Sequence, residues 1–146
     1  MTIRDQRSGW TDGYPPPSKS TTNVRETVQD FEGSEKIDHW YSDGAGEIHA
    51  ACREEGTRHD KSDPNRHETN RVIERTNRTV IEGTRTVLFQ SGLPHKYLRE
   101  AMKCFCCLCN FHHKDAPKGT IPLMVRHNQT FKGMRMPFGA KIYYKP

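Results

Sequence analysis

The sequence predicts an α/β protein in which short strands alternate with amphipathic helices. Four segments have apolar residues at helical spacing and indicate helices: residues 20–32, 47–55, 70–90 and 94–113. Three further segments are short, bounded by turn residues, and indicate strands: residues 1–5, 10–14 and 36–41. Strands and helices that alternate in this way are typical of α/β architecture.

The first elements are two strands and a helix. Residues 1–5 and 10–14 are strand-like, and the triple proline that follows ends any strand because proline cannot donate to a ladder. Ser20 or Thr21 is expected to cap a helix that stops at Gly33, the residue type preferred after a helix end. The inward positions of this helix, spaced i, i+4 and i+7, are Val24, Val28 and Phe31.

A third strand and a second helix flank the first acidic candidate. Residues 36–41 indicate a strand, and Asp43 falls at its end, before a glycine-rich turn. An aspartate before glycine is also common in turns without any ligand role. Residues 47–55 indicate a short helix that Gly56 closes, and the polar residues 57–63 leave room for a short strand at most. The inward residues of this helix are expected to be Ile48, Ala51 and Cys52.

A long helix over residues 70–90 carries most of the candidate functional residues, with Thr69 or Asn70 as its N-cap. Its apolar stripe is expected at Val72, Ile73, Thr76, Val80, Val87 and Leu88. Arginines at steps of four, three and seven line a neighbouring face: Arg71, Arg75, Arg78 and Arg85. Glu74 stands beside this basic stripe, where a carboxylate suits a metal ligand next to a phosphate backbone. The alternative is a solvated helix face on which Glu74 pairs with Arg78 at i+4.

The last helix, over residues 94–113, contains a cluster of cysteines. Its apolar face is expected at Tyr97, Leu98, Ala101, Met102, Phe105, Leu108 and Cys109. The potential zinc ligands are Cys104, Cys106, Cys107, Cys109, His112 and His113. On a helix, however, Cys106 and Cys109 point differently from Cys104 and Cys107, and cysteine is a common small core residue. Both interpretations stay open. Beyond this helix, a loop, a short helix or turn at 121–127 and a strand-like run at 140–144 are expected.

Composition restricts the partners. The 146 residues carry a formal net charge of +5 with 32% hydrophobic residues, which indicates a thin core and a polyanionic partner. No apolar run reaches the length of about 18 residues that a membrane span needs, so a soluble, intracellular protein is expected.

Several motifs occur in the order found in one family. They are Ser8-Gly9-Trp10, Tyr41 to Glu47, Pro64 to Arg78, Glu82 to Arg85, Ser91 to Pro94 and Pro137 to Lys141. Together they resemble the catalytic core of DDE-type integrases of copia-like retrotransposons.

The resemblance implies an RNase H-like mixed sheet flanked by helices, with residues 1–113 as a partial catalytic core and 114–146 as its C-terminal extension. It also implies that Asp43 and Glu74 are catalytic residues that bind Mg²⁺ or Mn²⁺, the cations that hard oxygen ligands favour. The residues expected to contact DNA are Arg66, Asn70, Arg71, Arg75, Arg78 and Arg85.

Two departures from the family pattern bear on activity. The first catalytic aspartate has no match, and the family places it on the first, central strand of the sheet, so this chain is expected to lack that strand. Asp5 matches a position without a ligand role. Arg71 and His67 replace a usual glycine and proline.

The expected function is therefore that of a retrotransposon integrase core fragment, ancestrally a metal-dependent strand-transfer enzyme and inactive by itself. Sequence-independent DNA binding, a homo-oligomer, no membrane and a nuclear site of action are the accompanying expectations. The alternatives are a non-catalytic DNA-binding remnant and a helical protein-interaction module over residues 70–113.

Overall fold

The structure is a computed structural model that describes residues 1–15, 18, 20–62, 67–112 and 119–143, with the backbone alone for 67–70. The chain divides into two compact units. Unit 1 contains Met1 and residues 14–75, and unit 2 contains residues 2–13 and 76–146.

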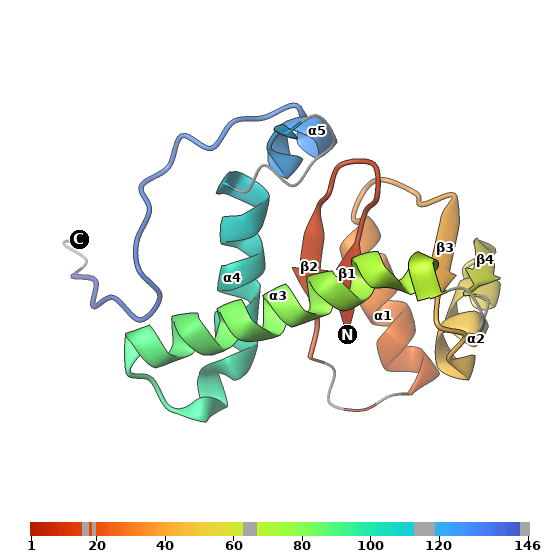
Figure 1. The fold of residues 1–146 in the computed structure, drawn as a ribbon, viewed down its shortest axis with the longest axis horizontal. Coiled ribbons are helices and arrows are strands. Elements are labelled where there is room, and N and C mark those ends of the chain that lie inside the picture. The colour runs from red at the N-terminus through yellow and green to blue at the C-terminus, as the bar shows by residue number, and fades with distance from the viewer. Residues whose placement is uncertain (16–17, 19, 63–66, 113–118, 144–146) are drawn as a thin grey trace. The chain divides into compact units, whose positions relative to one another are not determined.

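Unit 1 contains a parallel pair of strands joined through a helix. Strand β3 (His39–Ser42) pairs in parallel with β4 (Arg58–Lys61), and helix α2 (Gly46–Glu54) connects them (Figure 1). A parallel pair needs such a crossover because the chain must return to the end of the sheet at which the first strand begins. The predicted strand over 36–41 starts too early, since the ladder of β3 begins only at His39, opposite the first residue of β4.

Helix α1 (Thr21–Glu32) packs on α2 and closes the core of unit 1. Ser20 is its N-cap and accepts a hydrogen bond from the backbone N–H of Asn23, and Gly33 follows its end at φ 62°. This confirms the predicted cap and stop. The buried apolar residues of this core are Val24, Val28, Phe31, Trp40, Ala51 and Cys52. The predicted inward positions are thus confirmed except for Ile48, which is half-buried.

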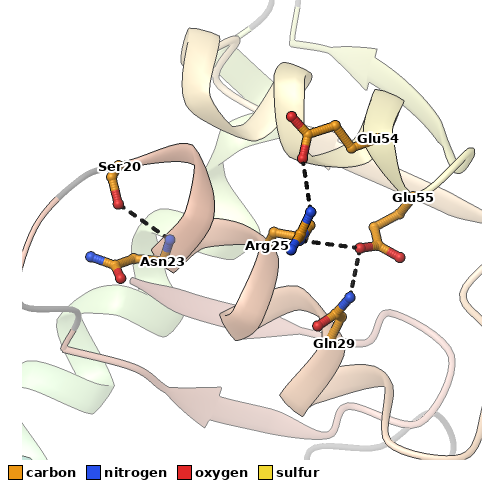
Figure 2. Close-up of polar contacts among 6 residues, drawn as sticks. All are labelled: Ser20, Asn23, Arg25, Gln29, Glu54 and Glu55. Carbon is orange, nitrogen blue, oxygen red and sulfur yellow. Dashed lines mark hydrogen bonds and ion pairs between the residues drawn. The ribbon is translucent and has the colours of Figure 1, made fainter.

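A polar clamp joins the exposed sides of α1 and α2. Figure 2 shows the guanidinium of Arg25 between two carboxylates at the end of α2, with Nη1 3.3 Å from Glu54 Oε2 and Nε 3.7 Å from Glu55 Oε1. Gln29 Nε2 donates to the same Glu55 oxygen at 2.7 Å. Because these groups are partly solvated, each pair contributes at most about 1 kcal/mol, and the clamp mainly orients the two helices.

Unit 2 contains an antiparallel hairpin that packs on a helix. Strand β1 (Thr2–Arg4) pairs with β2 (Thr11–Gly13), which confirms the two predicted N-terminal strands (Figure 1). Helix α4 (Leu98–His112), preceded by the 3-10 turn η1 (His95–Tyr97), lies along β2. An isolated hairpin is marginally stable, so α4 supplies the packing surface that it needs.

Helix α3 (His67–Ser91) is the longest element, and it begins in unit 1 and continues into unit 2. The predicted N-cap at Thr69 or Asn70 is wrong, because both residues already lie inside the helix.

The buried line of α3 confirms the predicted stripe at Thr76, Val80 and Leu88 and differs from it elsewhere. It runs through Thr76, Val80, Thr84 and Leu88, spaced four residues apart. Val72, predicted to be inward, is 51% exposed, while Ile73 and Val87 are half-buried.

Close contact between α3 and α4 depends on a glycine. A Cβ added at Gly83 would lie 2.0 Å from the ring of Phe105, so only glycine lets the ring approach. On α4, the buried residues are Ala101, Cys106 and Asn110, whereas the predicted inward Leu98 is 41% exposed.

The C-terminal part of unit 2 begins with helix α5 (Pro122–His127), which confirms the predicted short helix. The predicted strand over 140–144 is wrong for its described part, because residues 140–143 have no strand partner and are exposed. The sheet pairings among the described residues are the antiparallel β1–β2 and the parallel β3–β4, in two separate sheets.

Candidate functional site

Asp43 lies directly after β3, on a turn that the neighbouring strand stabilises. Ser42 Oγ accepts a hydrogen bond from the backbone N–H of Gly44 at 3.2 Å, so the turn closes around Asp43. The same hydroxyl lies 2.9 Å from His59 Nε2 on β4. Gly44 has φ 85°, a left-handed conformation that favours glycine. The carboxylate of Asp43 is exposed to solvent.

His59 belongs to a polar cluster on β4 that was not predicted from the sequence. Burial lowers the pKa of His59, and the neighbouring His49 and Lys61 lower it further. A neutral imidazole has one donor and one acceptor nitrogen, so it can either donate a hydrogen bond to a serine hydroxyl or accept one from it. The polar composition of β4 was visible in the sequence, but its register against β3 was not.

Asp60 on the same strand has an arginine and a histidine as partners. Its Oδ2 lies 2.9 Å from Arg58 Nη2 and 3.0 Å from His39 Nε2. The hydrogen bond from Arg58 is the main cause of the lowered pKa of this carboxyl. Asp60 is therefore an ion-pair partner and not a free ligand beside Asp43.

Glu74 lies on the solvent-exposed side of α3. Among the ion pairs of the described residues, none joins Glu74 to Arg78, the partner that the i+4 spacing suggested. Asp43 and Glu74 both belong to unit 1. Within the described ranges, no group of three or more histidine, cysteine, aspartate or glutamate side chains is arranged to hold a metal ion. The shared metal site of Asp43 and Glu74 stays a prediction.

The predicted basic stripe is exposed along α3. Arg71, Arg75, Arg78 and Arg85 all face solvent. On a helical projection they lie opposite the buried line of Thr76 to Leu88. Arg66 lies outside the described residues, and so does the side chain of Asn70.

The cysteines of α4 differ in exposure. Cys106 is buried and Cys107 is exposed, while Cys104 and Cys109 are half-buried. Burial, with a contribution from Asp12, raises the pKa of Cys106 to about 12. In the absence of a metal ion, this thiol is therefore protonated at neutral pH. His113 lies outside the described residues.

Asp5, which the sequence comparison left without a ligand role, closes the turn between β1 and β2. Its carboxylate accepts hydrogen bonds from the backbone N–H of Arg7 at 2.9 Å and of Ser8 at 3.2 Å.

None of the helices described is both long enough and apolar enough to cross a bilayer.

Comparisons with known proteins agree with the resemblance seen in the motifs. No protein-family model matches the sequence. The chain is 34% identical over 103 residues to the retrovirus-related Pol polyprotein from transposon TNT 1-94 of Nicotiana tabacum. That match covers 63% of this chain and 8% of the polyprotein, so the chain spans a small part of its relative.

Two solved structures share the fold. The catalytic core domain of BIV integrase superposes with a TM-score of 0.65 at 16% identity, covering 87% of this chain and 84% of that one. A chain in the cryo-EM structure of the simian T-cell lymphotropic virus intasome in complex with PP2A regulatory subunit B56 gamma superposes with a TM-score of 0.71 at 13% identity. That match covers 98% of this chain and 53% of the other. The predicted RNase H-like α/β class is confirmed, and the chain is similar to integrase catalytic cores.

Proposed function

We propose that this chain, which has the fold of an integrase catalytic core, binds DNA through the exposed arginines of α3. The observation that carries the proposal is the position of Arg71, Arg75, Arg78 and Arg85 on the solvent-facing side of one helix. Guanidinium groups form bidentate hydrogen bonds with phosphate oxygens, which makes arginine well suited to a DNA backbone. Such contacts position a protein on DNA without reading its sequence.

The electrostatics predict a strong dependence on salt. Each phosphate that a cation neutralises contributes about −0.9 to the slope of log K against log salt for duplex DNA. Four arginines in contact with phosphates would therefore contribute a slope of roughly −3.6. Binding of this kind is expected to be indifferent to DNA sequence and to divalent cations.

Asp43 and Glu74 are the proposed remnants of a metal-dependent integration site. Their oxygen donors suit Mg²⁺ or Mn²⁺ chemically. However, a two-metal site needs more carboxylates than these two, and no cluster of three ligand side chains occurs in the described parts of the chain. Among the described residues the donor set is thus incomplete, and we propose DNA binding, and not strand transfer, for this chain by itself.

Assembly on DNA belongs to the same proposal. One of the structures with this fold is an intasome, and copies of the present chain are proposed to associate on bound DNA. A protein that acts on chromosomal DNA would do so in the nucleus.

The test is a fluorescence-anisotropy titration of a labelled duplex with the full chain at several salt concentrations. The variant R75A/R78A/R85A is expected to reduce the salt slope by about 2.7, three times the contribution of one contact. Affinities with Mg²⁺ and with EDTA are expected to agree.

The matched control removes three exposed cations that lie outside α3: Arg7, Lys36 and Arg53. The variant R7A/K36A/R53A is expected to keep the slope of the unmodified chain within about one unit. Equal losses in both variants would mean that net charge, and not the α3 face, determines binding. Joining of DNA strands by the chain alone would contradict the assignment of binding without catalysis.

A further inference from the structure

Positive charge is concentrated at the C-terminal end of the chain. The last acidic residue is Asp115, and the 31 residues after it contain six lysines and arginines. The 115 residues up to that point contain 17 lysines and arginines against 18 acids. The whole formal net charge of +5 therefore depends on this acid-free segment, residues 116–146.

The described part of the acid-free segment after α5 is open to solvent. Residues 128–143 have no helix or strand, and each of them except the half-buried Phe138 is exposed. Lys132, Arg135 and Lys141 are exposed, and no ion pair found among the described residues involves them. Their charges are therefore available to a partner.

Two contacts hold this exposed part against the rest of unit 2. The ring of Phe131 stacks on Phe111 with centroids 4.7 Å apart. Farther along, a Cβ added at Gly139 would lie 2.8 Å from Ser91 Cβ, so the backbone passes close to the end of α3. These contacts restrict the conformational freedom of the residues between and after them, which lowers the entropy lost when the residues bind a partner.

Apolar side chains alternate with the cations along this part of the chain. Met134 and Tyr143 are 84% and 81% exposed, and Met136 and Ile142 are also exposed. The ammonium group of Lys141 lies 5.0 Å from the centroid of the Tyr143 ring. Proteins that bind single strands combine cations, which contact the phosphates, with aromatic rings, which stack on the accessible bases.

We propose that residues 128–143 bind single-stranded nucleic acid, with Lys132, Arg135 and Lys141 on the phosphates and Tyr143 stacked on a base. The partner is a single strand because duplex DNA hides the faces of its bases and offers only phosphates and base edges. These residues are different from the arginines of α3 proposed to bind duplex DNA.

The test uses the full chain and a fluorescein-labelled oligothymidylate, titrated at several salt concentrations. The variant K132A/R135A/K141A is expected to reduce the salt slope by about 2, because each phosphate contact on a single strand contributes about 0.7. The variant R7A/K36A/R53A is the matched control and is expected to leave the slope unchanged. An unchanged slope in K132A/R135A/K141A would overturn the proposal.

A second variant separates stacking from charge. Y143A is expected to weaken binding to the oligothymidylate at least about fivefold, the lower end for loss of one base stack, with less than a twofold change for the duplex. Equal weakening for both DNAs would refute the base contact. Binding to vesicles of phosphatidylcholine and phosphatidylserine that the triple variant abolishes, without oligothymidylate binding, would identify a lipid surface instead.

The outcome is independent of the function proposed for α3. R75A/R78A/R85A acts on duplex binding, and K132A/R135A/K141A acts on single-strand binding. Either surface can therefore fail its test while the other passes. Circular dichroism of each variant establishes that its fold is retained.

Discussion

Asn110 is the residue through which α4 stabilises the N-terminal hairpin, and its removal has a calculable cost. The side chain is 2% exposed. Its Oδ1 accepts from the backbone N–H of Thr11 at 2.9 Å, and its Nδ2 donates to the carbonyl of Thr11 at 2.8 Å. The amide thus pairs with β2 as a neighbouring strand would, although it belongs to a helix.

The substitution Asn110→Ala leaves both backbone groups of Thr11 without these partners in a buried place. Each unsatisfied group costs about 1–3 kcal/mol, so the free energy of unfolding is expected to fall by about 3 kcal/mol. For a chain of this size that loss lowers Tm by roughly 6–12 °C. Stabilities of domains are about 5–15 kcal/mol, so the variant should still fold.

The assay is urea and thermal unfolding followed by circular dichroism. Asn77→Ala on α3 is the control, because it makes the same chemical change on a helix at a half-buried position. Its effect is expected to stay within about 0.5 kcal/mol. A loss below about 1 kcal/mol in Asn110→Ala would show that the two hydrogen bonds do not contribute as described.

Three further predictions follow from the packing and the pKa shifts. Gly83→Ala is expected to cost about 1–3 kcal/mol in unfolding free energy, because the added methyl meets the aromatic ring 2.0 Å away, whereas Gly46→Ala, with nothing within 4 Å, should be neutral or stabilising. Cys107 is expected to react with a thiol reagent at pH 8 before Cys106, whose pKa is about 12. Mass spectrometry after brief labelling measures the order of reaction, and earlier labelling of Cys106 would contradict the prediction. Because the pKa of His59 is lower in the folded state than its usual value near 6.5, stability is expected to fall as pH drops below that value. The substitution His59→Gln should reduce this pH dependence. Identical stability profiles against pH for the variant and the unmodified chain would show that His59 is not its source.

Local patterns were sufficient to predict most helices of this fold. The start of α1 at Ser20 and its end at Gly33 follow from cap chemistry that involves only nearby residues. The start of α3 was misplaced because Thr69 and Asn70 are good capping residues that nevertheless lie inside the helix. Capping preference is a local quantity, and the helix start also depends on which turns find partners.

The side of a long helix that is buried was harder to predict than the helix itself. The sequence offers Val72 and Ile73 as apolar candidates on α3, and only contacts with other elements decide between neighbouring faces. The polar Thr84 became one of the most buried residues, because its hydroxyl donates to the Val80 carbonyl at 2.6 Å and is thereby satisfied. A hydrophobicity pattern cannot predict that local satisfaction.

The candidate site was predictable only to the level of individual residues. Exposure of the α3 arginines follows from their helical spacing. The hydrogen bond between Ser42 and His59 depends on the register of two strands that a helix separates in sequence. Such a register cannot be derived from residue types when every residue of β4 is polar.

The two proposed basic surfaces differ in the acids that accompany them, and this difference predicts their roles. On α3, Glu74 and Glu82 lie between the arginines in sequence, within a turn of Arg78 and Arg85. Because charges within a Debye length of about 8–10 Å act together, these carboxylates reduce the field of the helix beyond its immediate neighbourhood. The acid-free segment has no such compensation within its own sequence. Long-range attraction of a single strand is therefore expected to depend mainly on the acid-free segment, while α3 contributes short-range contacts to a duplex. Accordingly, K132A/R135A/K141A should mainly lower the association rate constant for the oligothymidylate, and R75A/R78A/R85A should mainly raise the dissociation rate constant for the duplex.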